Sequence, residues 1–417
     1  MRVIIIGAGI GGLCLAQGLR RSGVEAVVFE RAASAQAQVR GYGIHLDHHG
    51  MTALKACLPK AIFSELDRAA SYAGTVARFF DRRLRFLAST SERAPDGMGG
   101  HTLSQRRGIG RALLNRLLLS DLPDVQWNKT FQRYAVGADG RVTAYFSDGS
   151  SETGDLLVGA DGSNSRVRQQ YLPHIERMSV GVTAIAGRYV LSPERNDTLP
   201  ATLVDGAPNM LVPSSPDWLF FSAWLTPKDA SSDEPPSNAR DYVVWAYVAN
   251  ARALPAHLDA MNDAALQEMV LKRTVGWSDQ VRTLIRDAEP GSLSVIPLKS
   301  MPHLEPWPAS SVTLLGDAIH NMTPMAGIGA NTALRDAANL VQCLSAVIRG
   351  EASLKDEVAR YEERMRSYAN PAVLKSLGNA QRAGSGHRLG RMIFRTLLRL
   401  SGRLPWVEHR LFHGEDH

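Results

Sequence analysis

The first thirty residues restrict the fold more than any other part of the chain. Residues 2–6 (RVIII) contain an unbroken apolar run at positions 3–6, which predicts a buried strand of a parallel sheet. GAGIGG follows, and LCLAQGLRRSG then predicts a helix that ends at Gly23. VEAVVFE, at residues 24–30, predicts a second strand that ends on Glu30. A strand, a glycine turn, a helix and a strand make a βαβ unit, so we expect a parallel sheet with helices.

The spacing Gly7-x-Gly9-x-x-Gly12 is typical of dinucleotide sites. The first glycine permits a tight turn, the second lets a pyrophosphate approach the backbone, and the third lets helix and strand pack closely. The helix N-terminus offers free N–H groups to phosphate. Glu30 would accept hydrogen bonds from ribose hydroxyls and repel a 2′-phosphate, which argues against NADP at this site. A glycine-rich turn in another α/β domain would look the same, and the motif does not separate FAD from NAD.

A second strand–turn–helix pattern occupies residues 155–168, DLLVGADGSNSRVR. DLLVGA predicts a strand, and Asp161-Gly162 predicts a turn. Ser163 or Ser165 is expected to cap the helix that carries Arg168.

A third pattern begins at residue 312 with VTLLGDAIH, a predicted strand that ends at Gly316-Asp317. Pro324 then stiffens a glycine-containing loop. Asn331 or Thr332 is expected to cap a helix that continues through ALRDAANLVQCLSAVI.

In this order the three motifs resemble those of the single-component (group A) FAD-dependent aromatic hydroxylases. Salicylate hydroxylase, tetracycline-inactivating monooxygenases and polyketide-tailoring hydroxylases belong to that family. The positions that match its Asp-Gly and Gly-Asp motifs are Gly159, Asp161, Gly162, Arg168, Gly316, Asp317, His320, Pro324, Gly327, Gly329, Asn331 and Asp336. Ile328 and Arg335 depart from the residues that the family often has there, which leaves the subfamily and the substrate open.

The resemblance implies a tightly but non-covalently bound FAD, with NADPH or NADH as a transient co-substrate and O2. Asp317 would hold the ribityl or pyrophosphate end of FAD, Arg106 would add a polar contact, and Arg40 is a weaker candidate. The loop 324–331 would lie along the flavin ring, with the following helix N-terminus toward its pyrimidine edge. The residues expected to bind FAD are Gly7, Gly9, Ile10, Gly11, Gly12, Glu30, Arg31, Arg40, Arg106, Asp161, Gly316, Asp317, Pro324, Gly327, Ile328, Gly329, Ala330 and Asn331.

The reaction implied by the resemblance is a monooxygenation. NAD(P)H reduces FAD, a flavin C4a-hydroperoxide forms with O2, and one oxygen atom enters an aromatic or polycyclic substrate, with secondary metabolism as the expected setting. Epoxidation, Baeyer–Villiger insertion, or flavin reduction without oxygenation stay open as alternatives. The Trp-x-Trp-x-Ile-Pro signature of flavin halogenases does not occur in the sequence. No catalytic base is assigned.

The fold class implied is α/β: a Rossmann-like FAD-binding domain with an inserted, mainly antiparallel β substrate domain and C-terminal helices. The FAD-binding domain is expected in 1–72, 102–171 and 291–350, and the substrate domain in 73–101 and 172–290. A C-terminal helical segment is expected at 351–417.

The stretch 172–290 contains strand-like runs such as WLFFSAWL and YVVWAYVA, rich in β-branched and aromatic residues. We expect an antiparallel sheet that faces the flavin, with only every second aromatic side chain on the substrate face. These aromatic residues are Trp218, Phe220, Phe221, Trp224, Tyr242, Trp245 and Tyr247. His45 and Arg188 are further candidates for the substrate pocket. No metal is expected, because no carboxylate pattern accompanies the HLDHH stretch at 45–49.

Composition narrows the partners. A net charge of +6 without a block of like charge argues against nucleic acid, and three cysteines without a CxxC pair argue against disulfides and zinc. A cytoplasmic location is expected, since no signal peptide precedes residue 2 and no apolar run could cross a bilayer. The protein is expected to be a monomer or a homodimer. Residues 388–410 predict a helix with Arg391, Arg395 and Arg399 on one face. We expect it to pack on the FAD domain with these arginines in water, rather than on a membrane.

Overall fold

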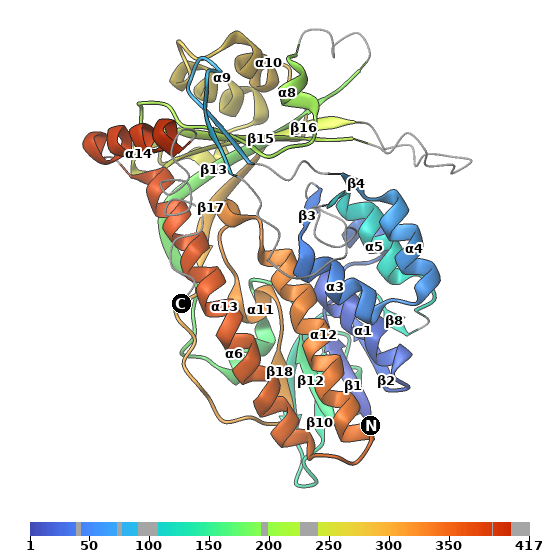
Figure 1. Ribbon diagram of the computed structural model, residues 1–417. Helices are drawn as coiled ribbons and strands as arrows, with labels where there is room; N and C mark the ends of the chain where they lie inside the picture. Colours follow the sequence, from blue (N-terminus) through green and yellow to red (C-terminus); the bar gives the residue numbers. More distant parts are fainter. Residues whose placement is uncertain are drawn as a thin grey trace. The chain divides into compact units, whose positions relative to one another are not determined.

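The computed structural model describes residues 1–38, 43–72, 77–90, 107–122, 124–192, 199–225, 241–385 and 387–401 of the 417-residue chain. The chain divides into two compact units, each assembled from three separate stretches (Figure 1). The first unit comprises Met1–Ala70, Ile109–Met178 and Lys299–Gly378, and the second comprises Ser71–Gly108, Ser179–Leu298 and Asn379–His417. The first unit thus extends beyond residue 350, where the sequence predicts the FAD-binding segment to end.

The first unit is built on a five-stranded sheet of order β18-β12-β1-β2-β8, in which every neighbouring pair is parallel. Its strands are β1 (Arg2–Ile6), β2 (Glu25–Phe29), β8 (Val125–Gln126), β12 (Leu156–Gly159) and β18 (Val312–Leu314). Val3, Ile4 and Ile5 are completely buried. Side chains on both sides of β1 are thus buried, as expected for a strand of a parallel sheet that is covered on both faces. The parallel pairing of β1 with β2 and β12 confirms the predicted parallel sheet.

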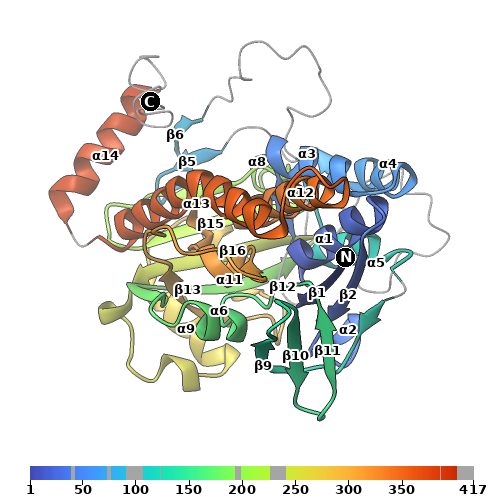
Figure 2. The same cartoon turned by 90° about the horizontal axis from the view of Figure 1, so that it is seen from below.

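Helices and a small sheet cover the two faces (Figure 2). On one face the helices α1 (Ile10–Arg21), α3 (His48–Cys57) and α12 (Gly329–Ile348) pack against one another. On the other lies an antiparallel three-stranded sheet of β9 (Phe131–Val136), β10 (Val142–Phe146) and β11 (Ser151–Gly154). The rings of Phe29 and Phe146 stack with centroids 4.4 Å apart and join this small sheet to β2. The architecture confirms the predicted Rossmann-like fold class.

The remaining elements are shorter or peripheral, apart from the long helix α13 (Figure 1). They are α2 (Ala35–Gln38), β3 (Ile44–Leu46), α4 (Lys60–Ala69), β4 (Ser71–Tyr72), β7 (Arg107–Ile109), α5 (Arg111–Leu119), α6 (Arg166–Tyr171), α8 (Ala201–Val204), η1 (Ala251–Ala253), η2 (Leu258–Ala260), α11 (Asp317–His320), η3 (Pro324–Ala326), α13 (Leu354–Gly384) and α14 (Arg388–Ser401). Among the described residues, none of the helices combines the length and the apolar character needed to cross a membrane.

Helix α13 carries a buried acid. Glu362 is 1% exposed, and its Oε1 accepts a hydrogen bond from the Thr313 hydroxyl at 2.8 Å. Burial raises the pKa of Glu362 to about 7. The folded protein therefore binds this proton more tightly than the unfolded chain does. The resulting stability is present below the ordinary pKa of 4.5 and is lost as the pH rises through 7.

Replacing Glu362 by glutamine is expected to stabilise the protein at alkaline pH. Glutamine keeps an acceptor for Thr313 and does not ionise. The variant should therefore exceed the wild type in free energy of unfolding by up to about 3 kcal/mol above pH 7, and match it near pH 4.5. Urea denaturation at both pH values measures the difference. Glu363→Gln, at the exposed neighbouring position, is the control and should show no such pH-dependent gain.

The second unit is built on a seven-stranded sheet of order β17-β13-β16-β15-β14-β5-β6. Its strands are β5 (Arg78–Phe80), β6 (Phe86–Ser89), β13 (Met178–Val190), β14 (Asn209–Leu211), β15 (Trp218–Trp224), β16 (Tyr242–Asn250) and β17 (Ser294–Ser300). The pairs β13–β16, β16–β15, β15–β14 and β5–β6 are antiparallel, and β14–β5 is parallel. The predicted, mainly antiparallel sheet is confirmed.

Strand alternation divides the aromatic side chains of this sheet between its two faces. Phe221, Trp245 and Tyr247 belong to a buried core that also contains side chains of α9 (Asp263–Arg273) and α10 (Asp279–Arg286). The cross-strand pairs Trp218–Val248, Phe220–Ala246 and Trp224–Tyr242 lie at the alternate positions. The remaining four aromatic residues of the predicted set therefore share the opposite face: Trp218, Phe220, Trp224 and Tyr242.

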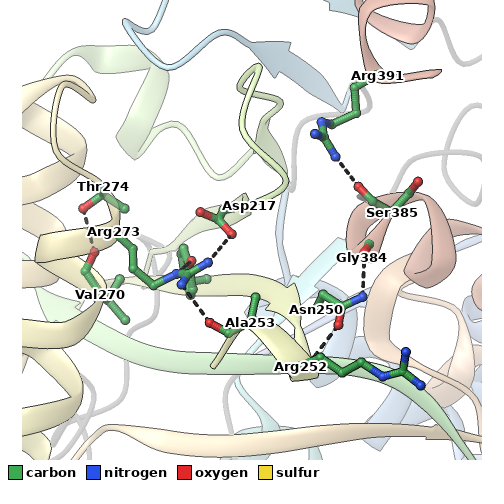
Figure 3. Close-up of polar contacts among 11 residues, drawn as sticks. Asp217, Asn250, Arg252, Ala253, Val270, Arg273, Thr274, Gly384, Ser385 and Arg391 are labelled. Carbon is green, nitrogen blue, oxygen red and sulfur yellow. Dashed lines mark hydrogen bonds and ion pairs between the residues drawn. The ribbon is translucent and has the colours of Figure 1, made fainter. Parts of the chain in front are cut away.

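Arg273 ties helix α9 to this sheet (Figure 3). Its guanidinium donates to the hydroxyl of Tyr247 at 2.5 Å, to Oδ1 of Asp217 at 3.0 Å and to the carbonyl of Ala253 at 2.9 Å. Tyr247 is completely buried, and burial followed by the charge of Asp217 raises the pKa of its hydroxyl, so it stays neutral. The polar groups of Arg273, Tyr247 and Asp217 at this side of the core are therefore hydrogen-bonded to one another.

Candidate functional site

Residues of the sequence motifs stand just beyond the carboxyl ends of four neighbouring strands. Gly7 directly follows β1, and Glu30 directly follows β2. Asp161 lies two residues past β12, and Asp317 lies three residues past β18. Since these strands are adjacent and parallel, all four ends meet at one edge of the sheet. Open α/β sheets bind their ligands in the crevice outside this edge.

The first glycine loop has the geometry that its spacing predicts. Gly7 has φ +109°, and a Cβ there would stand 2.4 Å from the carbonyl oxygen of Ala160. A Cβ on Gly12 would stand 2.1 Å from the carbonyl oxygen of Gly7. A Cβ on Gly9 would meet no atom within 4 Å. Two glycines are thus required for close packing, and the third leaves space from which a ligand can approach the backbone.

Helix α1 begins at this loop, and no acidic side chain of the helix neutralises the partial positive charge of its N-terminus. Its N-cap residue Gly9 provides no side-chain cap, and its first turn contains no acidic residue. Glu30, which is 8% exposed, accepts the backbone N–H of Ala8 on Oε2 and that of Ala32 on Oε1, both at 2.9 Å. Each carboxylate oxygen keeps a second lone pair for another donor. The end of α1 thus suits a phosphate, and Glu30 suits a pair of hydroxyls.

Asp161 contributes an acceptor with no partner. Its Oδ2 accepts the backbone N–H of Arg166 at 2.7 Å, whereas its Oδ1 is buried without a hydrogen-bond partner in the described part of the chain. Burial raises the pKa of the Asp161 carboxyl, although the backbone N–H groups of Arg166 and Val167 oppose the shift. Buried acceptors are rarely left unpaired, so this oxygen calls for a donor from a ligand or water.

The buried carboxylate of Asp336 fixes the Gly316-Asp317 turn by hydrogen bonds. Asp336 Oδ2 accepts the N–H of Gly316 at 2.7 Å and a hydrogen bond from His320 Nε2 at 2.6 Å, and Oδ1 accepts the Tyr368 hydroxyl at 2.6 Å. Burial lowers the pKa of His320, but the charge of Asp336 outweighs it and the net shift is upward. The guanidinium of Arg335 lies 4.0 Å from the Tyr368 ring centroid. Arg335, which departs from the family pattern, therefore contacts this cluster through the ring of Tyr368.

Arg168 links the second and third motifs. It is 4% exposed, and its Nη1 donates to the carbonyl of Ser163 at 3.2 Å and to that of Ala318 at 2.9 Å. Ser165 caps α6 by accepting the N–H of Arg168, which confirms one of the two predicted caps. Sequence reasoning assigned Arg168 no such role. Its position three residues after the cap, in the first turn of the helix that follows the buried strand β12, was the available signal.

The loop before α12 presents a second helix N-terminus. It contains η3, then Gly327 with φ +66°, and α12 begins at Gly329. The N-cap residue Ile328 provides no side-chain cap, and the first turn contains no acidic residue. A twenty-residue helix therefore offers its free N–H groups and partial positive charge at this loop.

Neither predicted cap of α12 is correct. Asn331 lies inside the helix, where its Nδ2 donates to the carbonyl of His45 and its Oδ1 accepts the N–H of Asp47, each at 3.0 Å. Thr332 instead donates to the carbonyl of Ile328 at 3.0 Å. The Asn331 side chain thus fastens the segment from β3 to α3, and this segment carries the pocket candidate His45, which is half-buried.

The remaining candidates fall into two groups. Arg40 and Arg106 lie outside the described residues, and Arg31 is exposed next to Glu30. Arg188, in the second unit, forms an ion pair with Glu289, so it does not present an uncompensated positive charge to a substrate.

Comparison with known proteins agrees with this geometry. The family model for an FAD binding domain matches residues 1–185 and 259–376. The chain is 30% identical to the dual O-methyltransferase/FAD-dependent monooxygenase elcB of Phaeosphaeria nodorum over 95% of this chain and 47% of that protein. It is also 30% identical to the FAD-dependent monooxygenase cctM of Talaromyces islandicus, over 90% of this chain and 91% of cctM. The chain spans about half the length of the first curated relatives it matches.

Solved structures show the same fold. A protein of Photorhabdus luminescens assigned as an FAD-containing monooxygenase superposes with a TM-score of 0.83 at 45% identity, over 92% of this chain and 98% of that one. HpxO of Klebsiella pneumoniae, solved with FAD and uric acid, superposes with a TM-score of 0.76 at 24% identity, over 97% and 94% of the two chains. Together with the family match over most of its length, these results show that the chain belongs to the FAD-binding-domain family of FAD-dependent monooxygenases.

Proposed function

We propose that the protein uses FAD, NAD(P)H and O2 to insert one oxygen atom into an aromatic or polycyclic small molecule. The observation that carries this proposal is the meeting of the three motifs at the ends of four neighbouring strands, with a helix N-terminus that no acidic side chain neutralises and an unpaired oxygen of Asp161 there. The names of the relatives, which are FAD-dependent monooxygenases, support the reaction class.

The residues at the sheet edge fit FAD. Glu30 suits the ribose hydroxyls, and the open backbone at Gly9 together with the end of α1 suits the pyrophosphate. Asp161 and Asp317 suit the hydroxyls of the ribityl chain. The N-terminus of α12 would stabilise negative charge on the ligand by about 0.3–1 kcal/mol. When bound, FAD would supply the redox chemistry, and the protein supplies the position and the electrostatic surroundings.

The second unit offers a surface for a planar substrate. In the largely buried strands β14, β15 and β16, the half-buried side chains of Met210, Phe220 and Ala246 are direct cross-strand neighbours on one face. They form an apolar platform, on which we propose that the Phe220 ring contacts a planar substrate. HpxO was solved with uric acid and PqsL of P. aeruginosa with 2-aminobenzoylacetate, both small aromatic compounds. We infer that this chain takes a substrate of that class.

A substrate screen tests the proposed function. The purified protein should retain flavin after gel filtration, and a panel of aromatic and polycyclic compounds should contain members that stimulate NAD(P)H and O2 consumption. The product should gain one oxygen atom by mass. A lactone or epoxide product would change the reaction to Baeyer–Villiger insertion or epoxidation. Hydrogen peroxide alone with every compound, or protein that never takes up FAD, would contradict the proposal.

Replacing Phe220 by alanine is expected to raise KM for the aromatic substrate about tenfold, because a stacking contact worth about 0.5–1.5 kcal/mol and its apolar area are lost. Steady-state kinetics measure the change. The matched control is Phe221→Leu, at the adjacent and completely buried position on the other face. That variant should lower the unfolding temperature and leave KM unchanged. Equal effects on KM at both positions would show that the platform does not contact the substrate.

A further inference from the structure

Helix α14 turns its first described arginine side chain, Arg391, inward. Arg391 is 5% exposed and donates to the carbonyls of Ser385 (Figure 3) and Ser214, the latter at 3.3 Å. Phe394, one turn further on, stacks on Trp218 with centroids 5.9 Å apart. The helix therefore packs on the second unit, not on the FAD-binding unit, and Arg391 is not in water. The expected packing on the FAD-binding unit is therefore wrong, and the expectation of arginines in water is wrong for Arg391, whereas Arg399 is exposed.

The outward face of α14 is apolar. Leu389, Met392, Ile393 and Leu400 are 64%, 61%, 50% and 38% exposed, and their spacing places them along one side of a helix. Strand β6 packs against α14. We call these four side chains of α14 the α14 stripe. A soluble helix normally turns such residues toward the core, so a stripe of this kind marks an interaction surface.

Positive charge surrounds the α14 stripe. Residues 388–401 contain four arginines and no acidic residue. The turn between β5 and β6 adds Arg82, Arg83 and Arg85, all exposed. In the part of the chain that the structure describes, none of these three forms an ion pair, and neither does Arg395 or Arg399.

The arginines also influence one another. Burial lowers the pKa of the Arg395 guanidinium, and the positive charges of Arg399 and Arg82 lower it further, against the opposing effect of Asp81. Although burial is the main cause, the contributions of Arg399 and Arg82 show that both positive charges lie close enough to act on Arg395. The surface is therefore suited to a partner that carries negative charge.

The charge decides which partner fits. In a symmetric contact with a second copy of the chain, the same patch would lie on both sides, so arginines would face arginines. An anionic phospholipid surface supplies both complements, acyl chains for the apolar side chains and phosphates for the arginines. We propose that the α14 stripe and its flanking arginines bind the surface of an anionic membrane, with the helix lying in the plane of the interface.

Vesicle sedimentation with the full-length, flavin-loaded protein tests the proposal. The protein should bind phosphatidylcholine vesicles that contain phosphatidylglycerol, and should not bind pure phosphatidylcholine vesicles. Added salt should weaken the binding. The double variant Met392→Ser, Ile393→Ser and the double variant Arg82→Glu, Arg83→Glu should each weaken it about tenfold or more.

Two control variants separate the patch from general effects of hydrophobicity and charge. Val275→Ser, at a site 71% exposed in the same unit, and Arg286→Glu, on the exposed side of α10, should bind vesicles as the wild type does. All variants should keep their flavin and their unfolding temperature. Binding that is absent, or equal in the patch and control variants, would overturn the proposal. A dimer in sedimentation velocity that the Met392→Ser, Ile393→Ser variant dissociates would instead assign the patch to a second copy.

Discussion

Replacing Gly12 by alanine is expected to weaken FAD binding strongly. The added methyl group would stand 2.1 Å from the carbonyl oxygen of Gly7, a backbone atom that cannot rotate away. The loop or helix α1 must shift, at a cost of about 1–3 kcal/mol or more, which corresponds to a loss of affinity of up to about a hundredfold. Flavin absorbance after desalting, and titration of the apoprotein with FAD, measure the effect.

Two other glycines make this experiment specific. At Gly9 a Cβ meets no protein atom within 4 Å, so Gly9→Ala should fold normally and yet bind FAD more weakly, because the methyl group occupies the ligand's approach. At Gly110 the Cβ is equally free and the φ of −62° is ordinary, so Gly110→Ala should change neither property. Full FAD affinity in the Gly12→Ala protein would show that the pyrophosphate does not lie at this loop.

Replacing Asp336 by alanine should have the second large effect. The substitution leaves the N–H of Gly316, the His320 ring and the Tyr368 hydroxyl without their shared acceptor in a completely buried place. Removing one member of a buried charged pair costs about 3–5 kcal/mol. The turn that carries Asp317 should also loosen, so FAD affinity falls together with stability. Chemical denaturation and FAD titration measure both, and Asp356→Ala, an exposed acid on α13, is the control.

The pH dependence gives this prediction a sharper form. Asp336 holds the pKa of His320 above its ordinary value of 6.5. Stability from the protonated ring is therefore present below pH 6.5 and is lost as the pH rises through the higher folded-state pKa. The isosteric Asp336→Asn protein lacks the charge, so its deficit relative to the wild type should be largest at mildly acidic pH and should shrink in alkali. A deficit independent of pH would show that His320 is neutral in the folded protein.

The sequence predicts the FAD-binding unit well because its signals are local. Gly7, Gly12 and Glu30 lie within one βαβ unit, and a turn that needs a missing Cβ can be recognised from spacing alone. The strand alternation that separates Phe220 from Phe221 is local as well, and the structure confirms it. These features follow from backbone geometry, which neighbouring residues determine.

The features that the sequence does not predict depend on distant partners. Asn331 looks like a helix cap, but its amide serves His45 and Asp47, nearly three hundred positions earlier, as their sequence separations of 286 and 284 show. Arg391 belongs to a run of arginines that is typical of a solvated face, but in the fold it turns inward and donates to the carbonyl of Ser214, which lies 177 positions earlier. A polar side chain has several possible partners, and the fold chooses among them.

The strand order of the first unit also determines when this protein can fold during synthesis. The central strand β1 is made before its neighbours, but β12 ends at residue 159 and the next strand, β18, at residue 314. Until residue 314 has left the ribosome, β12 has no partner on its outer side and its apolar residues stay exposed. We therefore expect the nascent chain to depend on chaperones, and truncations that end before residue 312 to aggregate instead of folding to a smaller flavoprotein.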